Sequence, residues 1–115
     1  MEILKKKNNN DKASTLYNMM HGTSRLPLKQ FDGDVLNIEN FIVYQDVTAE
    51  GEMITCVTIR EPDGTTWTTN GATFVRDFLS IVAACEECGE SLDAVKIVDG
   101  TSKKGRTYRT CEMVE

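Results

Sequence analysis

Alternation of apolar and polar side chains predicts an early β-strand whose pattern slips in the middle. Leu36 and Ile38 alternate with polar neighbours, whereas positions 41–44 are apolar on both faces. Because the parity changes between the two runs, we expect one long strand over 35–47 with a bulge near residues 39–40. A bulged strand of this length can take part in two sheets of a small barrel.

Two further strands are predicted as a tight hairpin. The run 53–61 is rich in β-branched residues, which favours a strand. Pro62, Asp63 and Gly64 follow it and form a strong turn signal, because proline presets φ and glycine accepts a positive φ. The run 65–70, which contains Trp67, is then the third strand.

The second half of the chain predicts a helix and then another hairpin. Over 72–88, apolar residues recur three and four positions apart, and Gly89 is a suitable helix stop. Strands over 94–98 and 106–114 follow, joined by a basic loop over 99–105. These two strands are the last elements that the sequence predicts.

The predicted order is β-β-β-α-β-β, the order of the OB-fold, which is a five-stranded Greek-key barrel. We therefore predict a mainly β domain over residues 31–115, a five-stranded OB-fold-like barrel with one helix. The alternative is another small α+β fold, in which a helix covers a five-stranded antiparallel sheet. Residues 1–30 are expected as a basic, flexible N-terminal arm. This arm could hold a short helix ended by Gly22, pair with another subunit, bind phosphate through Lys5–Lys7 or stay disordered.

The charge is distributed unevenly along the chain. The net charge is −5 overall, with +4 over residues 1–30 and −9 over residues 31–115. An acidic body disfavours nonspecific binding of duplex DNA. Residues 96–109 nevertheless form a local basic patch with a net charge of +4. The N-terminus lacks the apolar core of a secretory signal and no stretch is long enough to cross a bilayer, so we expect a cytoplasmic protein without a membrane partner.

Four cysteines stand at positions 56, 85, 88 and 111. Cys85 and Cys88 form one CxxC pair, but Cys56 and Cys111 stand alone in strand-like runs, which disfavours a two-knuckle zinc site. Burial as small hydrophobic residues is the favoured interpretation, with a single zinc as the alternative. The sequence holds one histidine, His21, and none of the common catalytic motifs. We expect neither an enzyme nor a cofactor.

The run from Val35 to Val114 resembles the small single-stranded-DNA-binding proteins encoded by phages of Gram-positive bacteria. The similarity rests on the opening strand LNIENF, the segment DGTTWTTNGATF and the closing hairpin KKGRTYRT. The chain departs from the family in two respects. Many members continue into a disordered acidic tail, whereas this sequence stops almost at the last predicted strand, and the basic arm has no counterpart in the family.

This resemblance implies sequence-independent binding of single-stranded DNA in phage replication or recombination. Such binding needs cations that meet phosphates and flat side chains on which bases stack. Alternatives stay open, because Trp67 can be a core residue, Tyr108 can serve either role and the basic loop can simply be solvated. The candidate binding residues are Arg60, Trp67, Lys96, Lys103, Lys104, Arg106, Tyr108 and Arg109.

Further partners could be replication proteins or a second copy of the chain in a homo-oligomer. The competing hypothesis is a protein-interaction module without enzymatic activity. Its acidic body would bind a basic partner, or one of its strand edges would pair with another chain.

Overall fold

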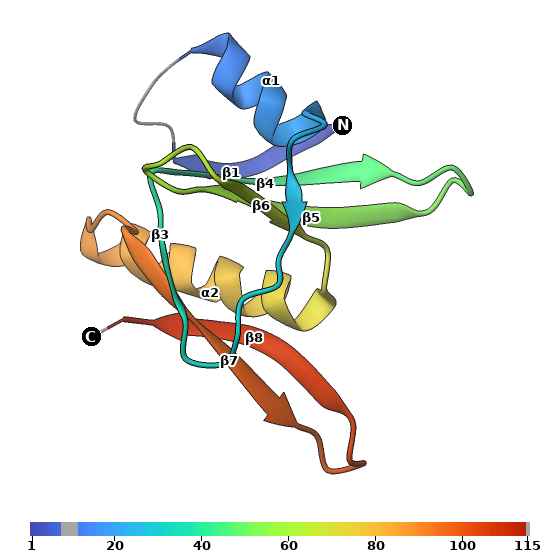
Figure 1. Ribbon diagram of the computed structural model, residues 1–115, viewed down its shortest axis with the longest axis vertical. Helices are drawn as coiled ribbons and strands as arrows, with labels where there is room; N and C mark the ends of the chain where they lie inside the picture. The colour runs from blue at the N-terminus through green and yellow to red at the C-terminus, as the bar shows by residue number, and fades with distance from the viewer. Residues whose placement is uncertain (8–11, 115) are drawn as a thin grey trace.

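The computed structural model describes residues 1–7 and 12–114, and within these ranges the chain is mainly β. The strands form two sheets with a helix between them (Figure 1). The first sheet has the order β1-β4-β5-β6-β2, and the second has the order β3-β7-β8. The strands are β1 (Glu2–Lys7), β2 (Leu26–Pro27), β3 (Val35–Asn37), β4 (Asn40–Val47), β5 (Met53–Arg60), β6 (Thr66–Thr69), β7 (Ala94–Thr101) and β8 (Thr107–Met113), and the helices are α1 (Ala13–His21) and α2 (Ala72–Cys88).

Helix α2 fills the space between the sheets because its apolar side chains form one continuous face. Phe74 and Phe78 are fully buried and stack on each other, and the ring of Phe41 from β4 meets Phe78 edge-on at 5.2 Å. The helix ends at Gly89, which adopts the left-handed conformation with φ 65°. The predicted helix, its core face and its glycine stop are all confirmed.

Strands β3 and β4 are the two halves of the long, interrupted strand that the sequence predicts. β3 pairs antiparallel with β7 in one sheet, and β4 pairs antiparallel with β5 in the other. At the interruption, the Ile38 N–H donates to the Asp93 carbonyl at 2.8 Å, and the Glu39 N–H donates to the Arg60 carbonyl at 3.0 Å. The prediction that one stretch of chain takes part in two sheets is confirmed.

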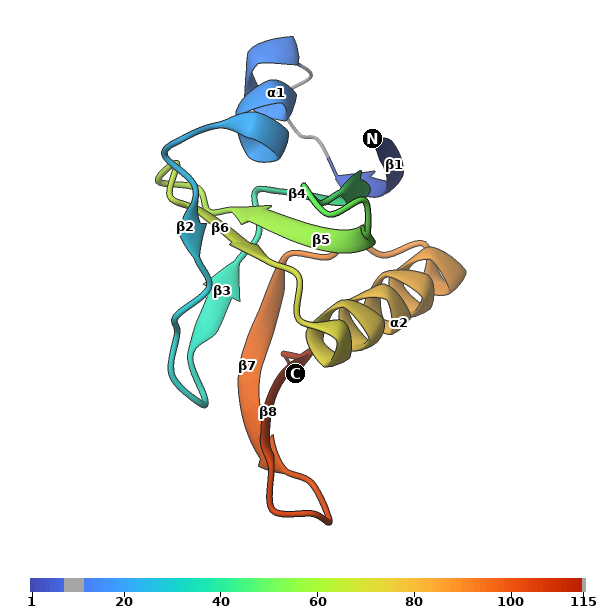
Figure 2. The ribbon, with the colours of Figure 1, turned by 90° about the vertical axis from the view of Figure 1, so that its right-hand side faces the viewer.

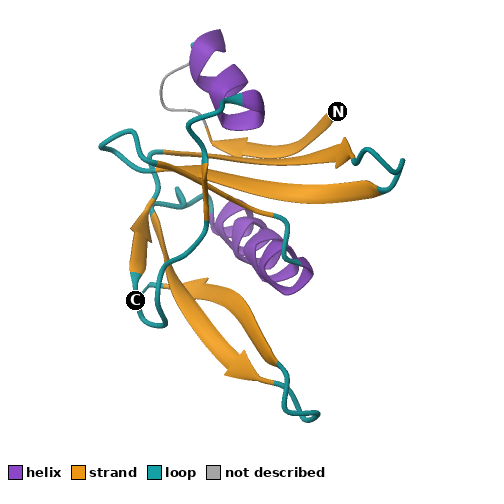
Figure 3. Ribbon diagram, turned by 45° about the vertical axis from the view of Figure 1, so that its right-hand side comes forward, coloured by secondary structure: helices purple, strands orange, loops and turns teal. Residues whose placement is uncertain are grey.

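The two sheets stay separate, in contrast to the single five-stranded barrel expected from the element order (Figure 3). Among the described strands, no ladder joins β6 to β8, the pairing that would close a barrel. The free side of β6 is instead taken by β2, whose Leu26 and Pro27 pair in parallel with Trp67 and Thr68. Because one strand edge bonds to one neighbour, this N-terminal segment occupies the position that β8 would need.

Helix α1 covers the outer face of the first sheet, where the sequence suggests a flexible arm. Met19 of the helix is 1% exposed and lies in a small cluster with Ile42, Tyr44 and Cys56 from β4 and β5. The short helix before Gly22 that the sequence allows is present. Burial of these apolar side chains stabilises the contact of α1 with the sheet. The sequence predicts disorder over residues 1–12, but Glu2–Lys7 form β1, which pairs with β4, and residues 8–11 lie outside the described residues. Neither described helix is long and apolar enough to span a membrane.

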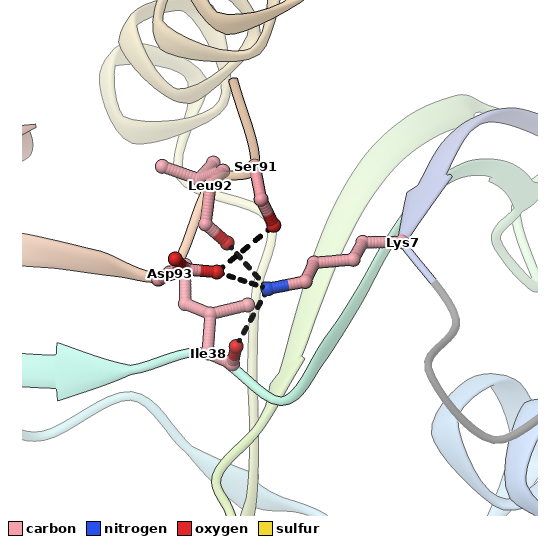
Figure 4. Close-up of polar contacts among 5 residues, drawn as sticks. All are labelled: Lys7, Ile38, Ser91, Leu92 and Asp93. Atoms are coloured by element: carbon pink, nitrogen blue, oxygen red, sulfur yellow. Dashed lines mark hydrogen bonds and ion pairs between the residues drawn. The ribbon is translucent and has the colours of Figure 1, made fainter. Parts of the chain in front are cut away.

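Lys7 holds β1 in place at a junction of three segments (Figure 4). Its Nζ donates to the carbonyl oxygens of Ile38 and Leu92 at 3.0 and 2.9 Å, and it pairs with the Asp93 carboxylate at 2.8 Å. The Lys7 side chain is 13% exposed, and its hydrogen bond is the main reason that the pKa of Asp93 lies below the usual 3.8. Strand β1 therefore pairs with β4 and, through Lys7, also contacts the residues that lead into β7.

Candidate nucleic-acid interface

The β7–β8 hairpin projects from the body of the molecule and presents its turn to solvent (Figure 2). The Ser102 N–H donates to the Arg106 carbonyl at 2.8 Å, and Gly105, with φ 78°, lets the chain reverse without strain. Lys103, Lys104 and Arg106 are all exposed at this turn. Within the described ranges, none of these three cations forms an ion pair with a carboxylate. Their charge is therefore available to an anionic ligand.

A groove of about 720 Å³ runs beside this hairpin, between β8 and the first half of α2. It brings together two predicted binding residues, Arg106 and Tyr108, on one of its walls. The turn lysines stand next to Arg106 along the chain, at the end of the same hairpin. The lining includes Thr73, Arg76 and Asp77 from α2 and Ser102, Arg106, Thr107 and Tyr108 from the hairpin.

Asp77 fixes the helix side of the groove in a charged, ordered state. The Arg76 guanidinium donates to its carboxylate at 3.0 Å, and the Thr110 hydroxyl of β8 donates to the same carboxylate. These two hydrogen bonds, from Arg76 first and Thr110 second, lower the pKa of Asp77 from its usual 3.8. The Arg76 side chain is 71% exposed, so its remaining donors can reach a phosphate bound in the groove.

Tyr108 supplies an aromatic surface to the same groove. It stands opposite Gly100 in the β7–β8 ladder, and it is 41% exposed although it is a large aromatic residue. Its neighbours along β8 on this face are Thr110, which is buried, and Glu112, which is exposed. The groove thus combines a partly exposed ring with cations at one end, the two kinds of group that binding of single strands requires.

Two predicted cations of the second sheet face carboxylates within the protein. Arg109 pairs with Asp99 at 2.9 Å, and this hydrogen bond raises the pKa of the arginine and lowers that of the aspartate. Lys96 stands opposite Glu112 in the β7–β8 ladder. Of the cations predicted over residues 96–109, those of the turn are therefore the ones that do not face a carboxylate of the described residues. Neither residue lines the groove.

Two predicted residues of the first sheet lie away from the hairpin. Trp67 packs against the main core, and its indole N–H donates to the Glu61 carboxylate at 2.8 Å, which agrees with the alternative that it is a core residue. Arg60 donates to the Asn40 side-chain oxygen at 3.4 Å and lines a separate pocket that α1 also lines. Helix α1 lies over the outer face of β4 and β5, next to this pocket.

Strand β1 carries the other basic cluster suggested by the sequence. Lys5 pairs with Glu86 of α2 at 2.9 Å, and Lys7 is bound at the junction described above. Two of the three lysines considered for phosphate binding therefore form ion pairs with carboxylates of the same chain. Lys6, between them, is exposed.

The sequence does not predict that Thr73, Arg76, Asp77 and Thr110 contribute to the site. The helical pattern places Arg76 and Asp77 on the polar side of α2, but it does not say which strand lies opposite. The one available signal is the parity of the last strand, which puts Thr110 on the same face as Tyr108. A polar strand face next to a polar helix face is compatible with a groove, and packing decides where it lies.

The four cysteines do not converge on one site. Cys85 and Cys111 belong to the core between the sheets, Cys56 lies in the cluster under α1, and Cys88 is exposed. Burial raises the pKa of Cys111 to about 12 and is also the main reason that the pKa values of Cys56 and Cys85 are raised. In the part of the chain that the structure describes, no three His, Cys, Asp or Glu residues are grouped to hold a metal ion. The buried cysteines have the character of core thiols.

Comparisons with protein-family models, with curated proteins and with solved structures give no match for this chain. The groove, the hairpin and the charges around them are the features of the chain that bear on its function. The arrangement offers an aromatic ring, ordered hydrogen-bond donors and cations that have no carboxylate partner among the described residues, all along one surface. An extended anionic chain with flat substituents is the ligand that these groups suit best.

Proposed function

We propose that this protein binds single-stranded DNA without sequence preference, in phage DNA replication or recombination, as its resemblance to the phage-encoded family implies. The β7–β8 turn contacts phosphates, and the adjoining groove receives the strand. One observation carries the proposal: Lys103, Lys104 and Arg106 stand exposed, without carboxylate partners among the described residues, at the end of a groove that contains Tyr108.

The distribution of charge supports a single strand over a duplex. Residues 31–115 carry a net charge of −9, so the basic turn is a local feature on an acidic body. A duplex presents two rows of phosphates over a broad surface, and the acidic body would repel much of it. A flexible single strand can reach the turn and enter the groove while it avoids the acidic faces.

The arrangement of elements also supports the proposal. The interrupted strand β3–β4, the hairpin β5–β6, helix α2 and the hairpin β7–β8 follow one another in the order of an OB-fold. We propose that residues 35–114 are an OB-type domain whose closing edge is occupied by β2. In such domains the loop between the last two strands belongs to the binding surface, and here that loop is the basic turn.

The test is a titration of a dye-labelled oligothymidine, followed by fluorescence anisotropy at several salt concentrations. The label belongs on the DNA, because Trp67 is packed against the core and is a poor reporter of the groove. The parent should bind, with an affinity that falls as salt rises. The variant with Lys103, Lys104 and Arg106 changed to Ala should bind more weakly, and its salt slope should be smaller by about 2, since each lost phosphate contact contributes about 0.7.

A charge-matched control separates the turn from net charge alone. Lys6, Lys12 and Lys29 are exposed and do not line the groove, so their triple change to Ala removes the same charge elsewhere. This control should bind much like the parent. The proposal fails if the parent shows no salt-dependent binding, or if both triple variants lose the same affinity.

A further inference from the structure

Gly100 is the second-last residue of β7 and still lies within its ladder with β8, where a glycine needs a reason. A glycine in a strand interior destabilises it by roughly 0.5–1 kcal/mol relative to alanine. Gly100 is not among the glycines with positive φ, so the backbone conformation does not require it. The small space above the Cα atom of Gly100 is what requires a glycine. A Cβ at this position would lie 2.5 Å from both Cζ and Oη of Tyr108, closer than such atoms can approach.

The Tyr108 ring therefore lies across the strand, with its phenol end directly over the Gly100 backbone. The two residues are opposite one another in the ladder, so the Tyr108 side chain lies on the face of the sheet to which a side chain at position 100 would point. Covering a glycine with a cross-strand aromatic ring fixes the ring and shields the strand from water. The close approach of the Tyr108 ring to the Gly100 backbone is a contact that restricts where the ring can lie.

The ring fixed in this way lines the groove. It is 41% exposed, and the groove wall beside it is formed by Arg106 and Thr107 on its own strand side and by Thr73 and Arg76 on the helix side. Arg76 and Arg106 can meet phosphates, whereas the ring can meet only a flat or apolar group. A ligand that satisfies all of them alternates charged and planar parts.

We propose that Gly100 is a positioning residue that holds Tyr108 as the stacking platform for one unpaired base. This inference rests on the proposed function and adds a division of labour to it, in which the turn binds phosphates and the Gly100–Tyr108 pair binds a base. A base within a duplex is already stacked on both faces, so the platform favours single strands. Alanine at position 100 would push the ring out of its place.

The experiment compares a labelled oligothymidine with an abasic oligonucleotide of the same length, which keeps the phosphates and removes the bases. For the normal oligonucleotide, Tyr108→Ala should weaken binding about tenfold, the loss of one stacked base. Gly100→Ala should cause a comparable loss, and Tyr108→Phe, which keeps the ring, should bind within about twofold of the parent. For the abasic oligonucleotide, all three variants should match the parent.

A double-mutant cycle distinguishes positioning from general damage to the hairpin. In the Tyr108→Ala background, Gly100→Ala should cause little further loss, because the ring that it displaces is already absent. Should Gly100→Ala fail to fold, the contrast between Tyr108→Ala and Tyr108→Phe on the two oligonucleotides still tests the platform. Independent, additive losses would overturn the positioning role.

The outcomes also separate this inference from the function on which it rests. If the parent binds both oligonucleotides equally, or Tyr108→Ala loses affinity for both alike, the platform is wrong while DNA binding stands. If the parent binds neither oligonucleotide, the proposed function fails and the platform fails with it.

Discussion

Strand β1 carries Lys5, Lys6 and Lys7, and the β7–β8 turn carries Lys103, Lys104 and Arg106. As sequences the two clusters look alike, since both are short basic runs. In the structure Lys5 and Lys7 pair with carboxylates, and Lys7 also binds two backbone carbonyls, whereas the three cations of the turn are exposed without ion pairs in the described ranges. The local surroundings decide which basic run stabilises the fold and which is left for a ligand.

The difference has a geometric origin. β1 lies along β4 and reaches the place where β3, β4 and the chain before β7 meet, so carbonyl oxygens and the Asp93 carboxylate surround the end of the strand. The turn lies beyond the end of both sheets, where the Arg106 carbonyl accepts from the Ser102 N–H and the Ser102 carbonyl accepts from the Gly105 N–H. The three predictions that follow test this contrast between a structural N-terminal segment and a hairpin turn that the fold does not need.

The largest effect is expected at the helix that follows β1. Met19→Ala removes a side chain that is 1% exposed, and it should lower the free energy of unfolding by about 2–5 kcal/mol. Tyr17→Ala on the same helix is the matched control, because Tyr17 is 63% exposed, and it should cost less than about 1 kcal/mol. Urea unfolding measures both. Equal, small losses would show that α1 is not packed on the sheet.

A smaller loss is expected from Lys7→Met, which keeps the aliphatic stem and removes the ammonium. The carbonyls of Ile38 and Leu92 lose a charged donor, so the free energy of unfolding should fall by about 2–3 kcal/mol. Lys104→Met makes the same chemical change in the turn and should stay within about 0.5 kcal/mol of the parent. Similar values for the two variants, again from urea unfolding, would remove the contrast between the clusters.

The smallest effect is expected in acid. The pKa of Asp93 is lowered in the folded state, mainly by Lys7, so the stability it contributes is present above the unfolded value near 3.8 and is lost as the pH falls through the lower folded value. Asp93→Asn should therefore lose less stability than the parent between about pH 5 and about pH 3. Lys7→Met should show the same reduced dependence, and Lys104→Met should not. Urea midpoints at the two pH values give the comparison, and identical acid losses in all variants would exclude a role for this pair.

The elements that the sequence predicts well are those with strong local patterns. Helix α2 has a regular apolar face and a glycine stop, and the slip between Ile38 and Phe41 marks the place where one strand passes between two sheets. The last hairpin is likewise visible from its residues, although β7 continues to Thr101 and the loop is therefore shorter than the predicted 99–105. Each of these signals comes from neighbours in the chain, so no knowledge of tertiary packing is needed to detect them.

The elements that the sequence misses are defined by distant partners. β1 reads as a polar, lysine-rich run because its stability comes from pairing with β4 and from the contacts of Lys7. β2 is two residues long and contains a proline, so no periodicity can indicate that it takes the edge of β6. For the same reason Arg106 and Tyr108 could be proposed from composition, whereas Arg76 and Asp77 could be found only once α2 and β8 were placed side by side.

The contacts of Lys7 also bear on the order in which the protein is completed during synthesis. Its carboxylate partner, Asp93, lies 86 residues further along the chain, and the carbonyl of Ile38 lies 31 residues away. Closing a loop of that length costs chain entropy, so contacts of this kind form after the local ones. Strand β1 leaves the ribosome long before the residues that fasten it exist. In a nascent chain, Lys7 therefore lacks its contacts with Leu92 and Asp93 until the residues that begin the second hairpin have been synthesised.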